Sequence, residues 1–192
     1  MPQLVLASTS PFRKQLLEKL KLEFITDSPD IDESRLVGET PEALVARLAE
    51  QKAMAVAERH PDSLIIGSDQ VAVNNGEILG KPGSHDKAVA QLQSTSGRRV
   101  TFLTGLCLYN SATGDSQVEV VPFGVVFREL SESQIENYLN AEQPYNCAGS
   151  FKSEAMGIAL FERLEGEDPN TLIGLPLIRL VRMLEAEGVR VI

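Results

Sequence analysis

LIIGSDQVAV, residues 64–73, is the stretch that decides the fold, because it reads as the central strand of a sheet. The aliphatic run Leu64–Ile66 is typical of a strand inside a sheet, and Val71–Val73 continue it. The strand is expected to turn at Asn74–Gly76, which consists of turn-forming residues. One carboxylate, Asp69, stands inside this apolar strand.

Strands and helices are predicted to alternate on both sides of this stretch, which indicates an α/β fold. Further strands are predicted at Gln3–Ala7, Phe24–Thr26, Val100–Tyr109, Val118–Phe127 and Ile158–Leu164. Helices are predicted at Pro11–Leu20, from the N-cap Thr40 to about Arg59, at Ser84–Ser94, from the capping box Ser131–Gln134 to Ala141, and from Pro176 to about Glu187. The turn at Thr113–Asp115 makes the two long strands a hairpin, so the sheet is expected to be mixed.

The length and composition suit one globular domain or two closely packed lobes. The chain has 192 residues, of which 43% are hydrophobic and 23% charged, enough for a sizeable core. It contains no internal repeat and no linker long enough to separate independent domains. We therefore treat residues 1–192 as a single domain.

The charge balance argues against a nucleic-acid or membrane partner. The formal net charge is −9 and the pI is near 4.8, so the surface as a whole repels phosphate backbones and anionic lipid. The N-terminus lacks the basic start and long apolar stretch of an export signal, and no segment is long and apolar enough to span a bilayer. We expect a cytoplasmic protein that binds neither nucleic acid nor membranes.

Cysteine and histidine usage points away from zinc and disulfides. Cys107 and Cys147 have no CxxC spacing, and His60 and His85 lack a neighbouring ligand pattern. We expect both cysteines to be buried structural residues. Carboxylates remain as metal ligands, and such oxygen-rich sites favour Mg²⁺ or Mn²⁺.

Two segments place polar groups at strand ends or inside strands. ASTSPFR, residues 7–13, lies between a strand and a helix, where hydroxyls, backbone N–H groups and Arg13 would form a phosphate cradle. The alternative is an ordinary helix cap. Burying Asp69 in an apolar strand costs desolvation unless a metal or a donor compensates it, which favours a metal ligand or general base over a turn-stabilising residue.

Three further segments supply complementary charges. The GKP loop carries Lys81, Lys52 is placed on the polar side of the preceding long helix, and Asp30–Glu33 form an acidic run. Carboxylates would hold a divalent cation, and lysines a polyphosphate; solvated surface residues are the alternative. Residues 149–157 and 168–171 suit the loop wall of a binding site, or ordinary exposed connections.

Together these segments resemble the Maf family of nucleotide pyrophosphatases over nearly the whole chain. ASTSPFR, DIDE, Lys52, GSDQ, GKP, the GSFKSEAMG loop and DPNTLIGLP occur in the family's order and spacing. The resemblance implies an α/β fold whose mixed, twisted sheet is flanked by helices, and two lobes with a substrate cleft between them. It also implies a homodimer in many members, and hydrolysis between the α- and β-phosphates of a nucleotide substrate.

Roles follow from the resemblance position by position. Asp69 would activate the attacking water, and Glu33 and Asp69 would hold the divalent metal. The triphosphate would be bound by Ser8, Ser10, Arg13, Lys52 and Lys81.

Three positions that flank the base, Phe12, Gln70 and Glu154, resemble the subgroup that acts on 7-methyl-GTP. Methylation at N7 gives guanine a positive charge, which attracts an aromatic face and a carboxylate. Glu154 can also accept the N1 and N2 protons of guanine. The chain departs from the subgroup at Phe12, where tryptophan is usual and stacks more strongly.

Two alternatives stay open at this point. The first is a pyrophosphatase for dTTP, UTP or CTP, which a panel of substrates would separate. The second is a non-catalytic regulator of cell division or septation, which would keep its cellular effect after Asp69→Asn.

Overall fold

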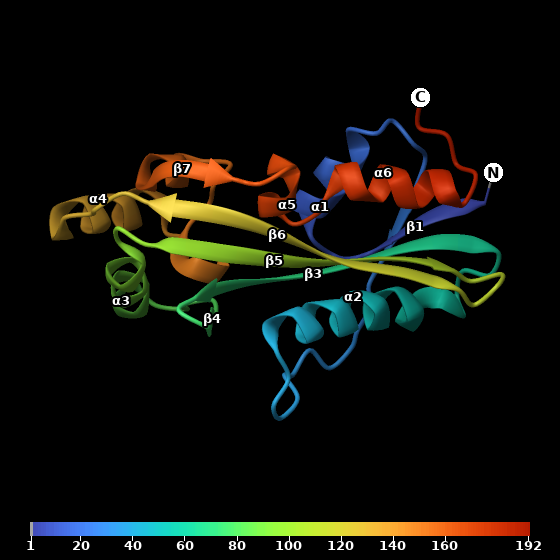
Figure 1. The fold of residues 1–192 in the computed structure, drawn as a ribbon, viewed down its shortest axis with the longest axis horizontal. Coiled ribbons are helices and arrows are strands. Elements are labelled where there is room, and N and C mark those ends of the chain that lie inside the picture. Colours follow the sequence, from blue (N-terminus) through green and yellow to red (C-terminus); the bar gives the residue numbers. More distant parts are fainter. Residues whose placement is uncertain (1) are drawn as a thin grey trace. The chain divides into compact units, whose positions relative to one another are not determined.

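A mixed seven-stranded sheet dominates residues 2–192, the part of the chain that the computed structural model describes (Figure 1). Its order is β2-β1-β3-β5-β6-β7, with β4 paired to β3. The strands are β1 (Gln3–Ala7), β2 (Ile25–Asp27), β3 (Ser63–Asn74), β4 (Glu77–Leu79), β5 (Arg99–Asn110), β6 (Ser116–Phe127) and β7 (Phe161–Glu165). The helices are α1 (Pro11–Glu18), α2 (Pro41–Ala57), α3 (His85–Thr95), α4 (Glu132–Glu142), α5 (Pro169–Ile173) and α6 (Leu177–Ala186), with 3₁₀ turns η1 (Ala148–Ser150) and η2 (Met156–Leu160).

The chain divides into two compact units, in agreement with the two lobes expected from the sequence. Unit 1 comprises residues 1–70, 103–121 and 168–192, and unit 2 comprises residues 71–102 and 122–167. Strands β3, β5 and β6 contribute residues to both. The substrate cleft between the lobes, and the treatment of residues 1–192 as one domain, stay predictions.

Unit 1 has helices on both faces of its part of the sheet. On one face, Leu4 and Leu6 of β1 join a core with α1 and α6, including Leu16 and Leu180. On the other face, Val5 and Ala7 of the same strand pack with α2. Figure 1 shows α2 on one side of the strands and α6 on the other. Successive side chains of a strand point to opposite faces, so this alternation assigns residues 4–7 of β1 and 64–66 of β3 each to one helix layer.

Two glycines let α2 approach the sheet closely. A Cβ on Gly67 of β3 would lie 2.0 Å from the carbonyl oxygen of Ala49, and one on Gly105 of β5 would lie 2.0 Å from that of Val45. Neither position has room for a side chain, because both carbonyls belong to the backbone of α2. This packing sets the height of α2 above β3.

Unit 2 is built around an aromatic core. Phe151 packs edge to face against Phe102, Phe127 and Phe161, with ring centroids 5.4, 5.6 and 4.9 Å away. The sequence prediction that residues 149–157 are exposed loop is therefore wrong for Phe151, and also for Gly149, Ser150 and Gly157, all of which are buried. Phe151 is surrounded in the sequence by polar and small residues, so the local pattern does not indicate that it is part of the core.

The predicted strands and helices are confirmed apart from a few boundaries. The capping box at Ser131 is present and begins α4. The last strand begins at Phe161 instead of Ile158, because residues 156–160 form a 3₁₀ turn. Residues 168–171, expected to be loop, form the N-cap and the first three residues of the short helix α5.

Candidate active site

The turn after β1 places two serine hydroxyls at the start of α1. Ser10 is the N-cap of α1, and its Oγ accepts from the backbone N–H of Arg13 at 3.3 Å. The buried Ser8 Oγ accepts from the backbone N–H of Ser10 at 3.1 Å. Within residues 2–192, neither hydroxyl proton has an acceptor. The helix cap and the phosphate cradle are compatible, since each hydroxyl keeps a proton to donate.

This turn lies where the strand order reverses. β1 is parallel to both of its neighbours, β2 and β3. The chain reaches β2 through α1 and β3 through α2, which cover opposite faces of the sheet. Ligands of open α/β sheets bind beyond the carboxyl ends of strands at such a reversal. Residues 8–10, which follow the end of β1, occupy that position.

Arg13, in the first turn of α1, has a guanidinium that is anchored at one of its three nitrogens. Its Nε donates to the carbonyl of Gly174 at 2.9 Å. Its two terminal nitrogens have no hydrogen-bond partner in the described part of the chain. Burial lowers the pKa of Arg13, while the negative charges of Asp69 and Glu33 raise it. A half-buried guanidinium whose two terminal nitrogens can still donate hydrogen bonds suits a phosphate group.

Lys52 joins the two predicted metal ligands. Its Nζ lies 2.7 Å from Asp69 Oδ1 and 3.1 Å from Glu33 Oε2. The prediction that Lys52 lies on the polar side of its helix is wrong, since the residue is 6% exposed and belongs to the buried face of α2. The close approach of α2 at Gly67 brings the ammonium over Asp69, which lies two residues further along the same face of β3.

The loop that carries Glu33 is tied to α2 by Arg47, a residue that the sequence analysis did not single out. Arg47 makes a two-point ion pair with Glu39, with Nε–Oε1 at 2.6 Å and Nη2–Oε2 at 2.9 Å. Its Nη2 also donates to the carbonyl of Ser34 at 3.0 Å. The Arg47 guanidinium holds the pKa of Glu39 down at about 2. Arg47 thus keeps Glu33 beside Lys52.

Gln70 lies on the face of β3 opposite to Asp69, where it contacts α5. Its Nε2 donates to the carbonyl of Thr171 at 2.8 Å and to Thr104 Oγ1 at 2.9 Å. Thr104 Oγ1 in turn lies 3.3 Å from the Thr171 carbonyl, to which it donates. A carbonyl only accepts, so the amide nitrogen of Gln70 must face it. Oε1 of Gln70 is left as an acceptor.

The remaining predicted site residues are exposed. Phe12 on α1 is 42% exposed, as a ring that stacks on a base requires. Lys81 and Glu154 are exposed residues of unit 2. Their part in one site with the residues of unit 1 stays a prediction.

Residues 168–171 make structural contacts through the Asp168 carboxylate and the Thr171 carbonyl. Asp168 is buried, its Oδ1 accepts from the N–H of Asn170 at 2.8 Å, and its Oδ2 accepts from the N–H of Ile178 at 2.9 Å. These contacts fix α5 and the turn that follows it. The carbonyls of Thr171 and Gly174 then hold Gln70 and Arg13. A sequence motif cannot reveal backbone contacts of this kind.

The carboxylates of Asp69 and Glu33 fit a divalent metal ion whose coordination shell would be completed by phosphate oxygens of a substrate. No group of three or more His, Cys, Asp and Glu side chains among residues 2–192 could hold an ion by itself. Asp69 and Glu33 nevertheless share one cation, the Lys52 ammonium. Mg²⁺ is typically bound by one or two carboxylates together with substrate phosphates.

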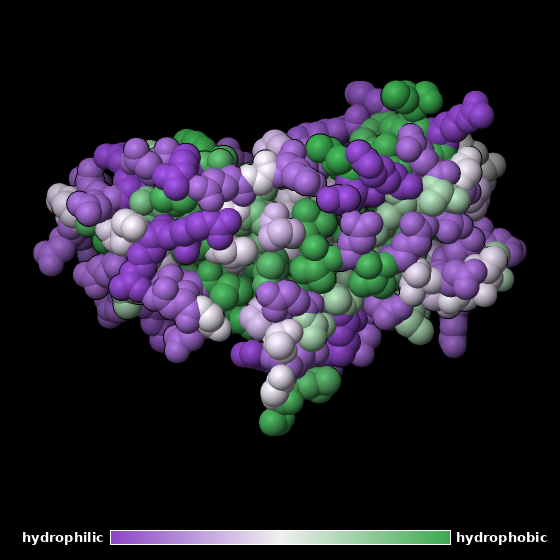
Figure 2. All heavy atoms as spheres, viewed as in Figure 1, coloured by the Kyte–Doolittle hydropathy of each residue, from purple (hydrophilic) through white to green (hydrophobic). Residues whose placement is uncertain are grey.

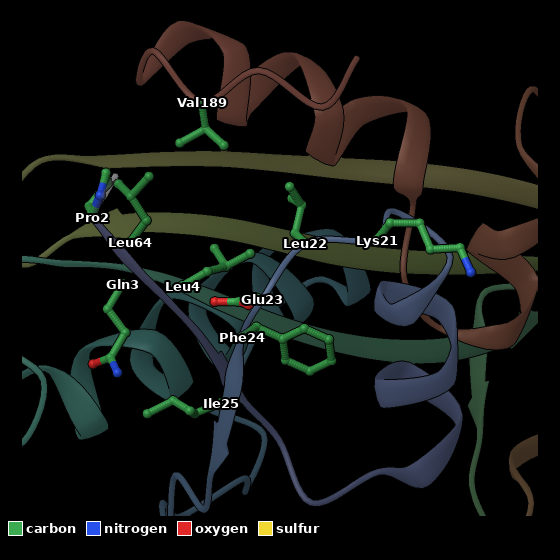
Figure 3. Close-up of a pocket in the computed structure, with 10 residues that line it drawn as sticks. All are labelled: Pro2, Gln3, Leu4, Lys21, Leu22, Glu23, Phe24, Ile25, Leu64 and Val189. Carbon is green, nitrogen blue, oxygen red and sulfur yellow. The ribbon is translucent and has the colours of Figure 1, made fainter.

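One cavity of the structure lies away from these residues. It has a volume of about 560 Å³ and is lined by Pro2, Gln3 and Leu4 at the amino end of β1 (Figure 3). Lys21 and Glu23 are its charged lining residues, so it has one cation and one anion. It lacks the cations that a polyphosphate needs.

None of the helices in the described chain is long and apolar enough to cross a membrane.

Serine hydroxyls, an arginine fork and a lysine-bridged pair of carboxylates at a strand reversal define an α/β protein with a candidate polyphosphate site. Comparison with known families agrees, since the model of the Maf-like proteins matches residues 3–187. The chain belongs to the Maf family.

Two curated relatives carry a more specific name. A "7-methyl-GTP pyrophosphatase" from Alcanivorax borkumensis is 65% identical over 98% of this chain and 96% of its own. Another from Colwellia psychrerythraea is 59% identical over 100% of this chain and 96% of its own. Among solved structures, a HAM1 protein from Coxiella burnetii aligns with a TM-score of 0.47 and 15% identity over 68% of this chain and 75% of that one. That likeness is too weak to bear on function.

Proposed function

We propose that the chain is a nucleoside triphosphate pyrophosphatase that hydrolyses 7-methyl-GTP to 7-methyl-GMP and pyrophosphate. The observation that carries the proposal is the contact of Asp69 and Glu33 with the buried ammonium of Lys52. The negative charges of the same two carboxylates act on the guanidinium of Arg13 and raise its pKa. The names of the two relatives support the same reaction. Such an enzyme would work in the cytoplasm, and we expect it to form a homodimer.

Asp69 would act as general base. Its Oδ1 is held by Lys52, and its Oδ2 has no hydrogen-bond partner within residues 2–192. That oxygen would take the proton of the water whose oxygen bonds to the α-phosphorus, while the anhydride bond to the pyrophosphate breaks. Glu33 and Asp69 would together hold a divalent metal. Mg²⁺ or Mn²⁺, when bound, would offset phosphate charge and lower the pKa of a coordinated water.

Cationic and hydroxyl donors would bind the triphosphate. Arg13 offers its two terminal nitrogens, and Ser8 and Ser10 offer their hydroxyl protons. Lys52 and Lys81 would offset the charge that grows on the departing pyrophosphate.

The base would be read by Phe12, Gln70 and Glu154. A positively charged 7-methylguanine stacks on an aromatic face and is attracted to a carboxylate. Gln70 offers only its carbonyl oxygen, which suits the N–H donors on the edge of guanine. We assign the same role to Glu154, which is exposed.

A substrate panel tests reaction, base and metal together. Pyrophosphate release would be measured with 7-methyl-GTP, GTP, dTTP, UTP and CTP, each with Mg²⁺, with Mn²⁺ and after chelation. We expect the highest kcat/KM for 7-methyl-GTP and loss of turnover on chelation. A preference for unmethylated pyrimidine triphosphates would contradict the assignment, and turnover that survives chelation would contradict the metal.

A further inference from the structure

One backbone carbonyl accepts hydrogen bonds from two side chains that are far apart in the sequence. The oxygen of Gly174 accepts from Arg13 Nε at 2.9 Å and from Ser68 Oγ at 3.0 Å. Ser68 lies on β3, Arg13 on α1, and Gly174 at the end of α5. All three belong to unit 1. The carbonyl therefore links a buried hydroxyl to the guanidinium of Arg13.

Ser68 is fully buried, so its hydroxyl cannot itself meet a ligand. Its exposed fraction is 0%. A serine hydroxyl has one proton, which here goes to the Gly174 oxygen. The alternation along β3 places Ser68 on the face of the sheet opposite to Asp69. Its hydroxyl proton reaches toward the candidate site through that oxygen.

The turn at Gly174 is shaped to receive both donors. Gly174 has φ 127°, and an added Cβ would lie 3.3 Å from Arg13 Nε. Its N–H is bonded to the carbonyls of Asn170 and Thr171, both at 3.1 Å. The peptide unit that carries the Gly174 oxygen also contains the N–H of Leu175, which donates to the carbonyl of Asn170 at 3.3 Å. With this N–H bonded to α5 and its oxygen bonded to Ser68, the peptide unit has little freedom to rotate. Arg13 Nε is then fixed in direction, and its two terminal nitrogens with it.

We propose that Ser68 is a positioning residue, which holds the Gly174 carbonyl and thereby orients the Arg13 guanidinium toward a triphosphate. The inference rests on the proposed function for the identity of the ligand. Ser68 would thus contribute to phosphate binding without itself contacting a phosphate. A fully structural Ser68 would affect stability alone.

The test compares Ser68→Ala with a matched control, Ser63→Ala. Ser63 is a buried serine of the same strand whose Oγ also donates to a backbone carbonyl, that of Pro61, at 3.0 Å. The readouts are KM for 7-methyl-GTP and the Kd for inorganic triphosphate measured by calorimetry. For Ser68→Ala we expect both to rise about fivefold, the size of one lost hydrogen bond. Ser63→Ala should keep both within about twofold.

Two further variants show whether the effect passes through Arg13. Ser68→Thr keeps the hydroxyl and should restore the wild-type Kd. Arg13→Lys removes the nitrogen that contacts Gly174, so adding Ser68→Ala to it should weaken binding no further. If Ser68→Ala does not fold, Ser68→Cys takes its place, because a thiol is nearly isosteric and a much weaker donor.

The proposal is overturned if Ser68→Ala leaves the Kd for inorganic triphosphate unchanged, or weakens it equally in the Arg13→Lys background. A wild-type protein that binds inorganic triphosphate but does not hydrolyse 7-methyl-GTP would overturn the proposed function alone. A wild-type protein that hydrolyses 7-methyl-GTP but does not bind inorganic triphosphate would overturn the positioning role alone.

Discussion

The buried ion pair of Lys52 and Asp69 is the residue contact on which the proposed chemistry depends most. Asp69 is 7% exposed and Lys52 6% exposed, and an uncompensated charge at either position would be costly. The pair is therefore kept together in the absence of a ligand. A triphosphate and a divalent cation would bring the charges that allow Lys52 to turn toward phosphate.

Replacing Asp69 by asparagine tests the general base. We expect Asp69→Asn to lower kcat by about 10²- to 10⁴-fold, because the amide cannot accept the proton of the attacking water. The melting temperature and the circular dichroism spectrum should still report a folded protein. Asp62→Asn, at an exposed position ahead of β3, is the control and should keep wild-type turnover. Full activity of Asp69→Asn would remove the residue from the mechanism.

Asp27 gives a prediction about acid stability. Hydrogen bonds from Arg59 and then His60 lower the pKa of Asp27 from an ordinary 3.8 to about 2. A carboxylate with a depressed pKa stabilises the fold above its unfolded-state pKa, and this contribution is lost as the pH falls through the folded-state value. In urea unfolding at pH 7, Asp27→Asn should cost up to about 1 kcal/mol, because the pair is partly exposed. The difference from wild type should shrink between pH 4 and pH 2, and a difference that grows there would contradict this assignment.

Among the elements, α2 depends on two glycines of the sheet beneath it. Gly67→Ala or Gly105→Ala would drive a methyl group into the helix backbone, at 2.0 Å from a carbonyl oxygen in each case. We expect each change to lower the free energy of unfolding by about 1–3 kcal/mol. Gly67→Ala should also lower kcat, because pushing α2 away from the sheet would move the Lys52 ammonium away from the Asp69 carboxylate. Gly80→Ala, where nothing lies within 4 Å of the added Cβ, is the control for stability in urea.

β3 distributes its polar residues between two helix layers, and Thr104 of β5 takes part on the side of α5. Thr104→Val keeps the shape of the side chain but removes the hydroxyl that fixes the Gln70 amide. We expect the ratio of kcat/KM for 7-methyl-GTP over UTP to fall about 3- to 10-fold, the size of one hydrogen bond. Thr104→Ser keeps the hydroxyl and should preserve the ratio. An unchanged ratio in Thr104→Val would mean that Gln70 does not need this anchor.

At the level of the whole molecule, neither unit is a continuous piece of chain. β3, β5 and β6 each supply residues to both units, so we expect one cooperative unfolding transition. Phe151→Leu in the aromatic core of unit 2 should lower the stability by roughly 1–3 kcal/mol and still give one calorimetric transition with equal calorimetric and van't Hoff enthalpies. Two separate transitions would show that the units unfold independently.

The exposed apolar residues of the molecule include a loop tip. Leu36 and Val37, in the loop before α2, are exposed, and Figure 2 shows apolar residues at the end of that loop. Met54 on the outer side of α2 is also exposed. The expected homodimer would be tested by sedimentation of the purified protein.

Much of the fold was predictable because local patterns are strong in this chain. The aliphatic run of β3, the N-cap Thr40 and the capping box at Ser131 each gave the correct element. The short helix α5 was missed, since five residues carry too little periodicity to be recognised. Phe151 was missed because burial of a single aromatic residue depends on Phe102, Phe127 and Phe161, which are remote in the sequence.

For the candidate site, the residue types followed from the sequence and their partners did not. Carboxylates, lysines and hydroxyls at strand ends indicate a polyphosphate and a divalent cation whatever the exact packing, because charge and donor chemistry belong to the side chains. The contacts of Lys52 with Asp69 and Glu33, and of Gly174 with Arg13 and Ser68, needed the tertiary structure. They arise where α2 and the turn after α5 meet opposite faces of β3, and distances between such remote segments are set by packing, not by spacing along the chain.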